Sequence, residues 1–268
     1  MAARGWTHWD KPGKSPRKMG VSTGMGPHWT QALAGMVLAA GLAGCATGPA
    51  SPEALAANDP FEKANRAALK RNAVIDQYLV IPALELYVLT VPEPGRRGVH
   101  NFLGNLALPT VFVNDMLQGE ISRAGQSVWR LALNTTLGLG GFLDPAAKIG
   151  IPAHGEDFGQ TLAVWGVGEG PYLVLPFVGP SNPRDATGMA TDVLIDPTNH
   201  IHIKQHIWWD AGRIYFTLLD LKGQSFEALQ EIQRNSVDYY SSLRSLYRQM
   251  RSEQIRNGRK TAEDLPDF

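Results

Sequence analysis

Three histidines are the closest approach to a metal-site spacing in the chain: His200, His202 and His206. His202 and His206 are four residues apart, which places both side chains on one face of a helix. A zinc site needs further ligands, and no glutamate lies between the pair as it does in the HExxH pattern. We therefore predict no metal site and interpret the histidines as part of a polar helix face.

Residues suited to acid–base or nucleophilic catalysis are also sparse. Glu156 and Asp157 are adjacent carboxylates, but such groups more commonly cap a helix or lie on the surface. The chain has no GxSxG motif, and the glycines of residues 166–170 lack the GxxxxGK pattern that binds phosphate. We predict no catalytic residue, no cofactor and no enzyme activity. A hydrolase that uses Glu156 and Asp157 is the weakest of three functional interpretations.

The only cysteine, Cys45, follows a stretch with the order of a signal peptide. Residues 1–44 carry five basic side chains and then an uncharged segment from Ala32 to Gly44. That segment would span about 20 Å as a helix, which is short of the membrane core. Leu42-Ala43-Gly44 before Cys45 is similar to the cleavage motif of bacterial lipoproteins. The sequence predicts a signal peptide over residues 1–44 and lipid attachment at Cys45.

The charge balance changes once the predicted signal peptide is removed. The full chain has 25 basic and 25 acidic residues, and residues 45–268 retain 20 and 24 of them. This small acidic excess gives no electrostatic reason to expect nucleic acid as a partner. Eight basic residues gather between Lys222 and Lys260 against four acidic ones. They could face anionic headgroups, an acidic protein or solvent, and the sequence does not choose among these.

Hydrophobic periodicity predicts mainly helices, in one domain over residues 59–258. Asp59 and Pro60 are expected to begin the first helix, as N-cap and first residue, and Pro82 to kink or break it. Residues 172–178 fit a short strand or an extended buried segment. Ten glycines between residues 138 and 179 predict tight turns and close backbone approaches. Further helices are predicted over residues 94–106, 120–137, 183–195 and 200–219, with a restart of the chain at Pro109.

The ends of the chain have their own signatures. Residues 45–58 are small, polar and contain proline, which predicts a flexible tether. An apolar period of three to four predicts one long amphipathic helix over residues 222–258, with a stop at Asn257-Gly258. Residues 259–268 are expected to be disordered. No stretch after the signal peptide has eighteen uninterrupted apolar residues, so no transmembrane helix is predicted in the mature chain.

Motifs in the order of a known family run from residue 59 to about residue 196. They are Asp59-Pro60-Phe61-Glu62, Asn65-Arg66, Asn101 to Leu106, Leu133 to Gly138, Gly141 to Asp144, Glu156 to Leu162, Trp165 to Gly168, Gly170 to Pro176, and Gly179 to Ser181 with Arg184-Asp185. Through these motifs the chain resembles the MlaA (VacJ) family of outer-membrane lipoproteins. It departs from the family pattern at Leu69 and Arg71, where aromatic residues are common.

This resemblance implies a fold, a location and a function. The implied fold is mainly α, a ring-like arrangement of amphipathic helices with a glycine-rich central segment. The body would lie at the periplasmic face of the outer membrane, anchored through acylated Cys45. The implied function is removal of mislocalised glycerophospholipids from the outer leaflet through an amphipathic channel, which maintains lipid asymmetry. The implied partners are a soluble periplasmic carrier (MlaC-like) and trimeric outer-membrane porins.

A lipid channel needs a polar track for the headgroup, and nine residues in or near the motifs are candidates for it. For each, a structural cap or a buried hydrogen-bond network is the competing interpretation. The alternative function is a lipid-anchored scaffold that organises porins or the cell envelope without transporting lipid. The nine candidates are Asn65, Arg66, Asn101, Asn105, Asn114, Asn134, Gln160, Arg184 and Asp185.

Overall fold

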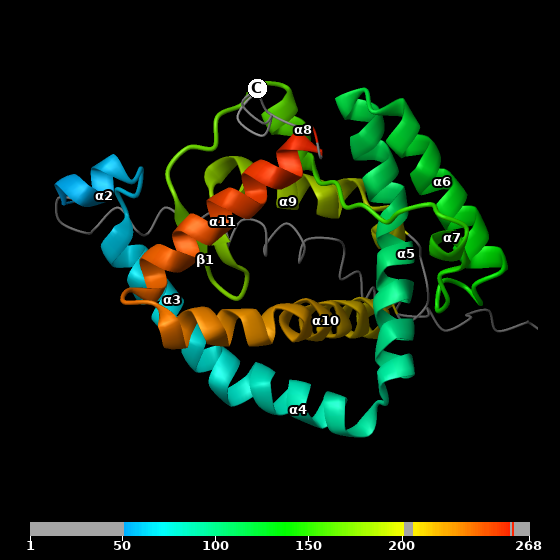
Figure 1. The fold of residues 1–268 in the computed structure, drawn as a ribbon, viewed down its shortest axis with the longest axis horizontal. Coiled ribbons are helices and arrows are strands. Elements are labelled where there is room, and N and C mark those ends of the chain that lie inside the picture. Colours follow the sequence, from blue (N-terminus) through cyan, green and yellow to red (C-terminus); the bar gives the residue numbers. More distant parts are fainter. Residues whose placement is uncertain (1–50, 201–205, 258, 260–268) are drawn as a thin grey trace, which may run out of the picture.

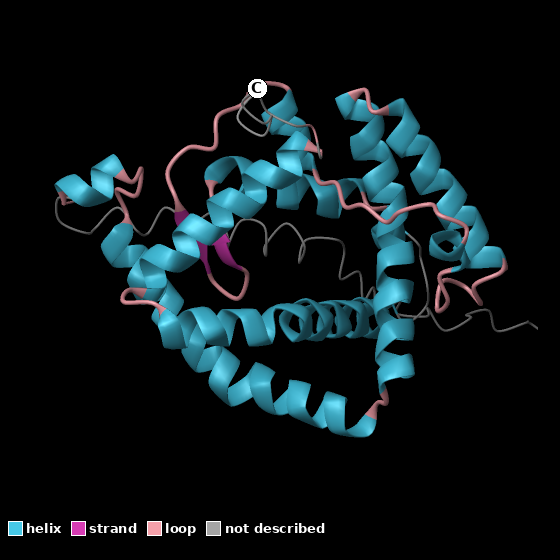
Figure 2. Cartoon of the chain, viewed as in Figure 1, coloured by secondary structure: helices cyan, strands magenta, loops and turns pink. Residues whose placement is uncertain are grey.

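The computed structural model describes residues 51–200, 206–257 and 259 and is mainly helical, as the sequence predicts. Figure 2 shows that strands make up only one short hairpin of this part of the chain. The signal peptide, Cys45, His202 and residues 260–268 lie outside the described residues. The elements are α2 (Pro52–Ala56), α3 (Glu62–Ile75), the π-helical turn η2 (Asp76–Val80), α4 (Ile81–Thr90), α5 (Glu93–Gln118), α6 (Ile121–Thr136), α7 (Pro145–Lys148), α8 (Phe158–Val164), β1 (Leu173–Leu175), β2 (Gly179–Ser181), α9 (Pro183–Ile195), the 3-10 turn η3 (Pro197–His200), α10 (His206–Asn235) and α11 (Tyr239–Arg256).

The order of packing contacts closes on itself and forms a ring. From α3 the chain continues into α4, which packs against α10; α10 packs against α5 and α5 against α8. The circuit returns through α11, which contacts both α8 and β2, and through β1, which packs against α3. Figure 1 shows α4 and α10 along one edge of this frame, α5 along a second, and α9 and α11 opposite α4. The ring-like arrangement predicted from the sequence is therefore present.

The first long helix differs from its prediction at both marked positions. Asp59 is not the N-cap of α3: the helix begins at Glu62, and Asp59 is fully buried. Pro82 does not break the helix, because the wider π turn of η2 directly precedes it. A π turn displaces the carbonyl groups that would otherwise clash with the proline ring. The same carbonyl groups would lack a hydrogen-bond donor, because proline has no N–H. The helical segment Glu62–Thr90 is therefore continuous over 29 residues.

This segment also bears on the prediction that the mature chain has no transmembrane helix. By length and composition, Glu62–Thr90 is one helix that is long and apolar enough to cross a membrane, and almost none of its apolar stretch is buried. The criterion of uninterrupted apolar residues missed it, because Asp76 and Glu85 interrupt the run. Core helices of soluble proteins and signal sequences meet the same criterion of length and composition.

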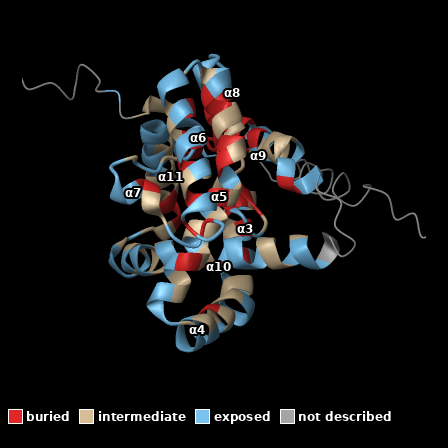
Figure 3. Cartoon of the chain, turned by 90° about the vertical axis from the view of Figure 1, so that its right-hand side faces the viewer, coloured by how far each residue is buried: buried red, intermediate tan, exposed pale blue. Residues whose placement is uncertain are grey.

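Pro109 does not restart the chain as predicted, since α5 runs through it from Glu93 to Gln118. Tertiary packing overrides the local cost of the proline: Leu108, Thr110 and Val111 around it are all buried. A left-handed Gly119 then ends α5, and α6 returns antiparallel beside it. Figure 3 shows buried residues concentrated in α5, α6 and α8, whereas α4 is mostly exposed or intermediate.

The strand at the start of residues 172–178 pairs with a second one that was not predicted. β1 and β2 are antiparallel, with Leu173 opposite Ser181 and Leu175 opposite Gly179. The glycines between residues 138 and 179 behave as expected at Gly141, whose φ is 104° and whose absent side chain leaves room for Asn105. A buried cluster that includes Ala68, Tyr172 and Tyr240 joins α3, β1 and α11.

The single C-terminal helix predicted over residues 222–258 is two helices in the structure. Residues 236–238 separate α10 from α11, and the Asp238 carboxylate caps α11 by accepting from the Tyr240 N–H at 3.2 Å. Asp238 also forms a two-fold ion pair with Arg66 of α3, which fixes the corner. The predicted stop is confirmed at Asn257, which is left-handed and ends α11. Within the predicted tether, residues 52–56 form the short helix α2, capped by the Ser51 hydroxyl.

Candidate functional site

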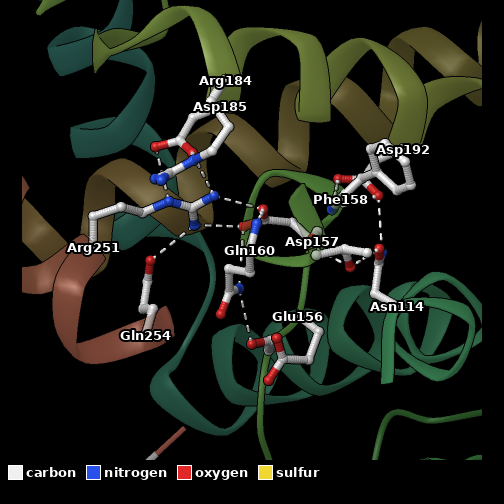
Figure 4. Close-up of polar contacts among 12 residues, drawn as sticks. Asn114, Glu156, Asp157, Phe158, Gln160, Arg184, Asp185, Asp192, Arg251 and Gln254 are labelled. Atoms are coloured by element: carbon white, nitrogen blue, oxygen red, sulfur yellow. Dashed lines mark hydrogen bonds and ion pairs between the residues drawn. The ribbon is translucent and has the colours of Figure 1, made fainter. Parts of the chain in front are cut away.

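A partly buried ion-pair cluster joins α8, α9 and α11 (Figure 4). Arg251 of α11 donates from Nη1 and Nη2 to the two carboxylate oxygens of Asp157, at 2.6 Å each, and from Nε to Asp185 at 2.9 Å. Asp185 also accepts from the Tyr247 hydroxyl at 2.5 Å and from Arg184 Nε at 3.0 Å. We call these five residues the Arg251 cluster. It positions the first turns of α8 and α9 against the C-terminal helix.

The electrostatics of the Arg251 cluster favour its charged state. Burial alone would raise the pKa of Asp157 and of Asp185, but hydrogen bonds and ion pairs with Arg251 outweigh it and lower both. Burial and the bond to Asp185 raise the pKa of the Tyr247 phenol, which therefore remains a hydrogen-bond donor. The cluster stays ionised at neutral pH and acts as a fixed structural contact.

Asn114 of α5 forms a second junction in the same region. Its Nδ2 donates to Asp192 of α9 at 3.0 Å, and its Oδ1 accepts from the Thr161 hydroxyl of α8 at 2.8 Å. Asp192 accepts in addition from the Phe158 N–H at the start of α8, at 3.0 Å. Burial raises the pKa of Asp192, opposed by the bonds from Phe158 and Asn114. One fully buried amide thus links three helices.

Glu156 is engaged by two neighbours rather than free for catalysis. Its carboxylate accepts from Arg123 Nη2 at 2.5 Å and from Gln118 Nε2 at 3.0 Å. Burial raises its pKa, and the two donors oppose that effect. Together with the binding of Asp157 by Arg251, this leaves neither member of the predicted carboxylate pair in the position of a general acid or base.

A buried serine, histidine and aspartate meet between α5 and α6, but not in the order of a catalytic triad. Ser127 Oγ donates to Asp115 at 2.9 Å, and His154 Nε2 contacts the same carboxylate at 2.9 Å. The contact between Ser127 and His154 uses that same nitrogen, at 3.3 Å. A triad requires the two ring nitrogens to bind the serine and the carboxylate separately. The sequence analysis did not single out these residues, and they form a buried structural network.

Asn65 and Arg66 belong to a separate cluster that joins α3, β1 and α11. Asn65 Nδ2 donates to Asp59 and to the Tyr172 carbonyl, at 2.8 and 2.9 Å, and Oδ1 accepts from the Val174 N–H at 2.9 Å. The Asn65 amide therefore binds β1 as a neighbouring peptide group would. Arg66 lies 4.2 Å from the centre of the Tyr240 ring and forms its ion pair with Asp238.

The remaining asparagines lie around α6 and the glycine-rich turn. Asn134 donates to Asp144 at 3.0 Å and accepts from the Ala146 N–H at 3.1 Å, so it anchors α7. Asn105 donates to Thr135 at 3.0 Å, while its Oδ1 is buried with no partner among the described residues. Asn101 is half-buried and donates to the Phe142 carbonyl at 3.3 Å.

The nine candidates for a headgroup track are therefore not brought together in one line. Seven of them are buried, and most have their polar atoms bonded within the protein. Three keep spare capacity among the described residues: Oδ1 of Asn105 and Oε1 of Gln160 are buried there without a partner, and the Arg184 guanidinium bonds to Asp185 through Nε alone. The described residues contain no group of three metal-binding side chains. His200 contacts the Leu194 carbonyl, and the structure does not describe the side chains of His202 and His206.

The sequence analysis did not single out the large apolar side chains of η2 and α4 that are exposed on the surface. Tyr78 and Leu79 of η2 and Leu86 and Leu89 of α4 have 61–84% of their surface exposed. Trp208 of α10 is 77% exposed as well. Burying a side chain of this size against an apolar phase is worth about 1.5–3 kcal/mol. The signal that could have identified these side chains was an apolar run interrupted by only two charged residues, Asp76 and Glu85.

The fold and the site define a class of protein: a mainly helical ring whose buried polar side chains are mostly hydrogen-bonded within the protein and which carries one long helix with an exposed apolar stretch. The sequence model of the MlaA lipoprotein family matches residues 57–254. The chain belongs to the MlaA lipoprotein family.

Named relatives and a solved structure agree with this assignment. The chain is 34% identical to the intermembrane phospholipid transport system lipoprotein MlaA of Escherichia coli, over 81% of this chain and 85% of that protein. It is 30% identical to the protein of that name from Haemophilus influenzae, over 88% and 95% of the two chains. An uncharacterized protein of Rickettsia bellii is 33% identical over 74% and 76%. A structure described as the structural basis for maintenance of bacterial outer membrane lipid asymmetry matches with a TM-score of 0.63 and 32% identity, over 74% and 98%.

Proposed function

We propose that this chain is the lipoprotein component of an outer-membrane phospholipid transport system. In this role it removes mislocalised glycerophospholipids from the outer leaflet and passes them to a soluble periplasmic carrier, which maintains the asymmetry of the membrane. The proposal includes lipid attachment at Cys45, a position at the periplasmic face, and trimeric porins as membrane partners. These finer points come from the family resemblance.

The observation that carries the proposal is the helical segment Glu62–Thr90. Its apolar stretch is long and almost entirely unburied, in a family whose named members belong to a phospholipid transport system. Such a surface is unfavourable in water and favourable against acyl chains. The apolar helix therefore supports membrane contact by the body itself, in addition to the predicted anchor.

A channel is needed because a phospholipid cannot cross water unaided at a useful rate. Exposing about thirty methylene groups costs on the order of 25 kcal/mol, at about 0.8 kcal/mol for each group. The protein would replace acyl contacts with apolar side chains and present polar groups to the headgroup. Arg184, Asn105 and Gln160 are the proposed headgroup contacts, since they keep unbonded polar atoms. The other six candidates, which include Asp185, are better explained as structural.

We also propose that the chain has no enzyme activity. Glu156 and Asp157 are held by arginines, and Ser127 binds a carboxylate directly. The test is hydrolysis of lipid esters by purified protein. Activity that disappears in Glu156→Gln would support the hydrolase interpretation instead.

The main experiment measures lipid transfer by the acylated protein purified from membranes. Labelled phospholipid is supplied in vesicles, and its appearance on a soluble periplasmic carrier is measured. We expect transfer from wild type and slower transfer from Arg184→Gln at equal protein level. Gln249→Ala, an exposed change on α11, is the matched control. Absence of transfer and of co-purified phospholipid, with porins still bound, would favour the scaffold function.

A further inference from the structure

The arginines of α11 bind the protein rather than facing outward. Arg244 Nη1 donates to the buried Asp59 carboxylate at 2.8 Å. Arg248 donates to the carbonyl of Ala57 at 2.8 Å and to that of Asn58 at 3.3 Å. Two successive arginines on one helix face therefore bind three consecutive residues, 57–59. This is the point at which the N-terminal segment enters the domain.

The entry point is held from other directions too. The Asn58 side chain donates to the Gly170 carbonyl at 2.8 Å, and the Asn58 carbonyl accepts from the Tyr172 N–H at 3.0 Å. The Asp59 N–H bonds to the Ala54 carbonyl at 2.8 Å, and Ala54 is buried although it lies in the short helix α2. Residues 51–59 are thus part of the folded body.

The binding of residues 57–59 by α11 shortens the length of chain between the predicted lipid at Cys45 and the folded body. Five residues, 46–50, separate the predicted lipid-bearing Cys45 from Ser51. At 3.3–3.6 Å for each residue, six steps reach about 20 Å, whereas a free tether to Asp59 would reach more than about 45 Å. A body held this close cannot tumble freely above a bilayer. The direction in which residues 51–59 leave the body then limits which face meets the membrane.

We propose that α11 acts as an anchor clamp: Arg244 and Arg248 fix residues 51–59 and so set the height and orientation of the body relative to the bilayer. The proposal rests on the predicted lipidation of Cys45 that forms part of the proposed function. It does not depend on lipid transport itself. It assigns the basic C-terminal helix to an internal partner, in place of headgroups or an acidic protein.

The clamp is tested first by hydrogen exchange of the full-length protein. Arg248→Ala removes two hydrogen bonds to backbone carbonyls, and we expect amide exchange at residues 54–59 to become about tenfold faster, while α5 is unchanged. Arg248→Lys should restore part of the protection. Gln249→Ala, the adjacent exposed residue, should leave it unchanged. Unchanged exchange in a folded Arg248→Ala protein would overturn the clamp, and a Tm measurement identifies a variant that fails to fold.

The orientation is tested by energy transfer from the body to the membrane. A donor dye is placed at Val237→Cys, a fully exposed position, in acylated protein in vesicles whose headgroups carry an acceptor. We expect a narrow donor–acceptor distance distribution in wild type. It should broaden in Arg248→Ala and after insertion of ten Gly and Ser residues between Ala50 and Ser51, which raises the root-mean-square reach of the linker by about 9 Å. Wild-type distances in both would overturn the proposal. Lipid transfer, measured on the same samples, tests the proposed function separately.

Discussion

Arg251 is the residue on which the polar interior depends most. It is the shared partner of Asp157 and Asp185, whose side chains come from two different helices. Buried ion pairs are weak evidence for stability when replaced as a whole, but removing one partner leaves uncompensated charge. The Asp185 carboxylate would then lie buried, beside the partly exposed Asp157 carboxylate, with only neutral donors and Arg184 nearby. The Arg251 cluster is therefore a single unit rather than a set of independent contacts.

We predict that Arg251→Met lowers the free energy of unfolding by about 3–5 kcal/mol at neutral pH. Arg251→Lys should lie between the two proteins, because an ammonium keeps the charge but cannot bind two carboxylates with a planar fork. Chemical denaturation checks the order of the three proteins. A loss below about 1 kcal/mol in Arg251→Met would contradict the role assigned to the cluster.

We also predict that the effect of Arg251→Met on the free energy of unfolding depends on pH. The folded-state pKa values of Asp157 and Asp185 are lowered from 3.8, so their contribution to stability is present above that value and is lost as the pH falls through the folded pKa. In Arg251→Met the unpaired carboxylates gain from protonation instead. The stability difference between wild type and variant should therefore be largest at neutral pH and shrink below about pH 4. A difference that is constant down to pH 3 would refute this assignment.

At the scale of single residues, the sequence identified polar residues of the interior but not the contacts that they make. Asn65, Asn114, Asn134 and Asp185 were found through family motifs. Asn65, Asn114 and Asp185 prove to be bonded to distant parts of the chain, and Asn134 to the turn that follows its helix. Tyr240, which bonds to the Asp59 partner of Asn65, is 181 residues away from Asp59. No local pattern records such a pairing, so a residue's type could be recognised while its contacts could not.

Helices α8 and α9 cross so closely that only glycine fits. A Cβ placed on Gly188 would lie 2.2 Å from the Gly159 backbone nitrogen and 2.6 Å from its Cα. One placed on Gly159 would lie 2.6 Å from Arg251 Nη2. The crossing thus brings the backbones together and also leaves space for the Arg251 cluster. The family motif around Gly159 is explained by packing.

We predict opposite effects for two glycine-to-alanine changes within helices. Gly188→Ala should lower stability by at least about 2 kcal/mol, because backbone cannot move aside as a flexible side chain can. Gly125→Ala, in the exposed part of α6 with nothing near its Cβ, should raise stability by about 0.5–1 kcal/mol through helix propensity. Thermal unfolding of both variants checks the pair. Similar Tm shifts would contradict the close crossing.

The element boundaries show which local signals tertiary structure overrides. The helix over residues 183–195 and the end at Asn257 were predicted correctly, since a proline at the first turn and a left-handed Asn act locally. Pro82 and Pro109 misled the prediction, because a π turn and dense packing compensate for them. The break at residues 236–238 was missed, since Arg66, far away in sequence, stabilises that corner.

At the scale of the whole molecule, the described residues bury more polar and charged side chains than hydrophobic ones, and many large apolar side chains are exposed. This inverts the usual distribution in a protein that is surrounded by water. The interior is compatible with folding because most of its buried polar side chains form at least one hydrogen bond within the described part of the chain. The exposed apolar side chains are unfavourable in water and become favourable where another apolar phase covers them. The apolar face of η2 and α4 is one such surface, on a continuous helix.

We predict that Leu86→Glu combined with Leu89→Glu weakens vesicle binding of residues 45–268 with Cys45→Ser, which tests membrane contact without the signal peptide or the lipid anchor. Each leucine is more than half exposed, so the folded protein should lose little stability. Removing two leucines from the membrane costs about 3–5 kcal/mol, a decrease in partitioning of at least about a hundredfold. Gln249→Glu together with Ser245→Glu on α11 adds the same charge elsewhere and should have a small effect. Equal losses in both double variants would attribute binding to net charge, and no loss in either would remove α4 from the membrane contact.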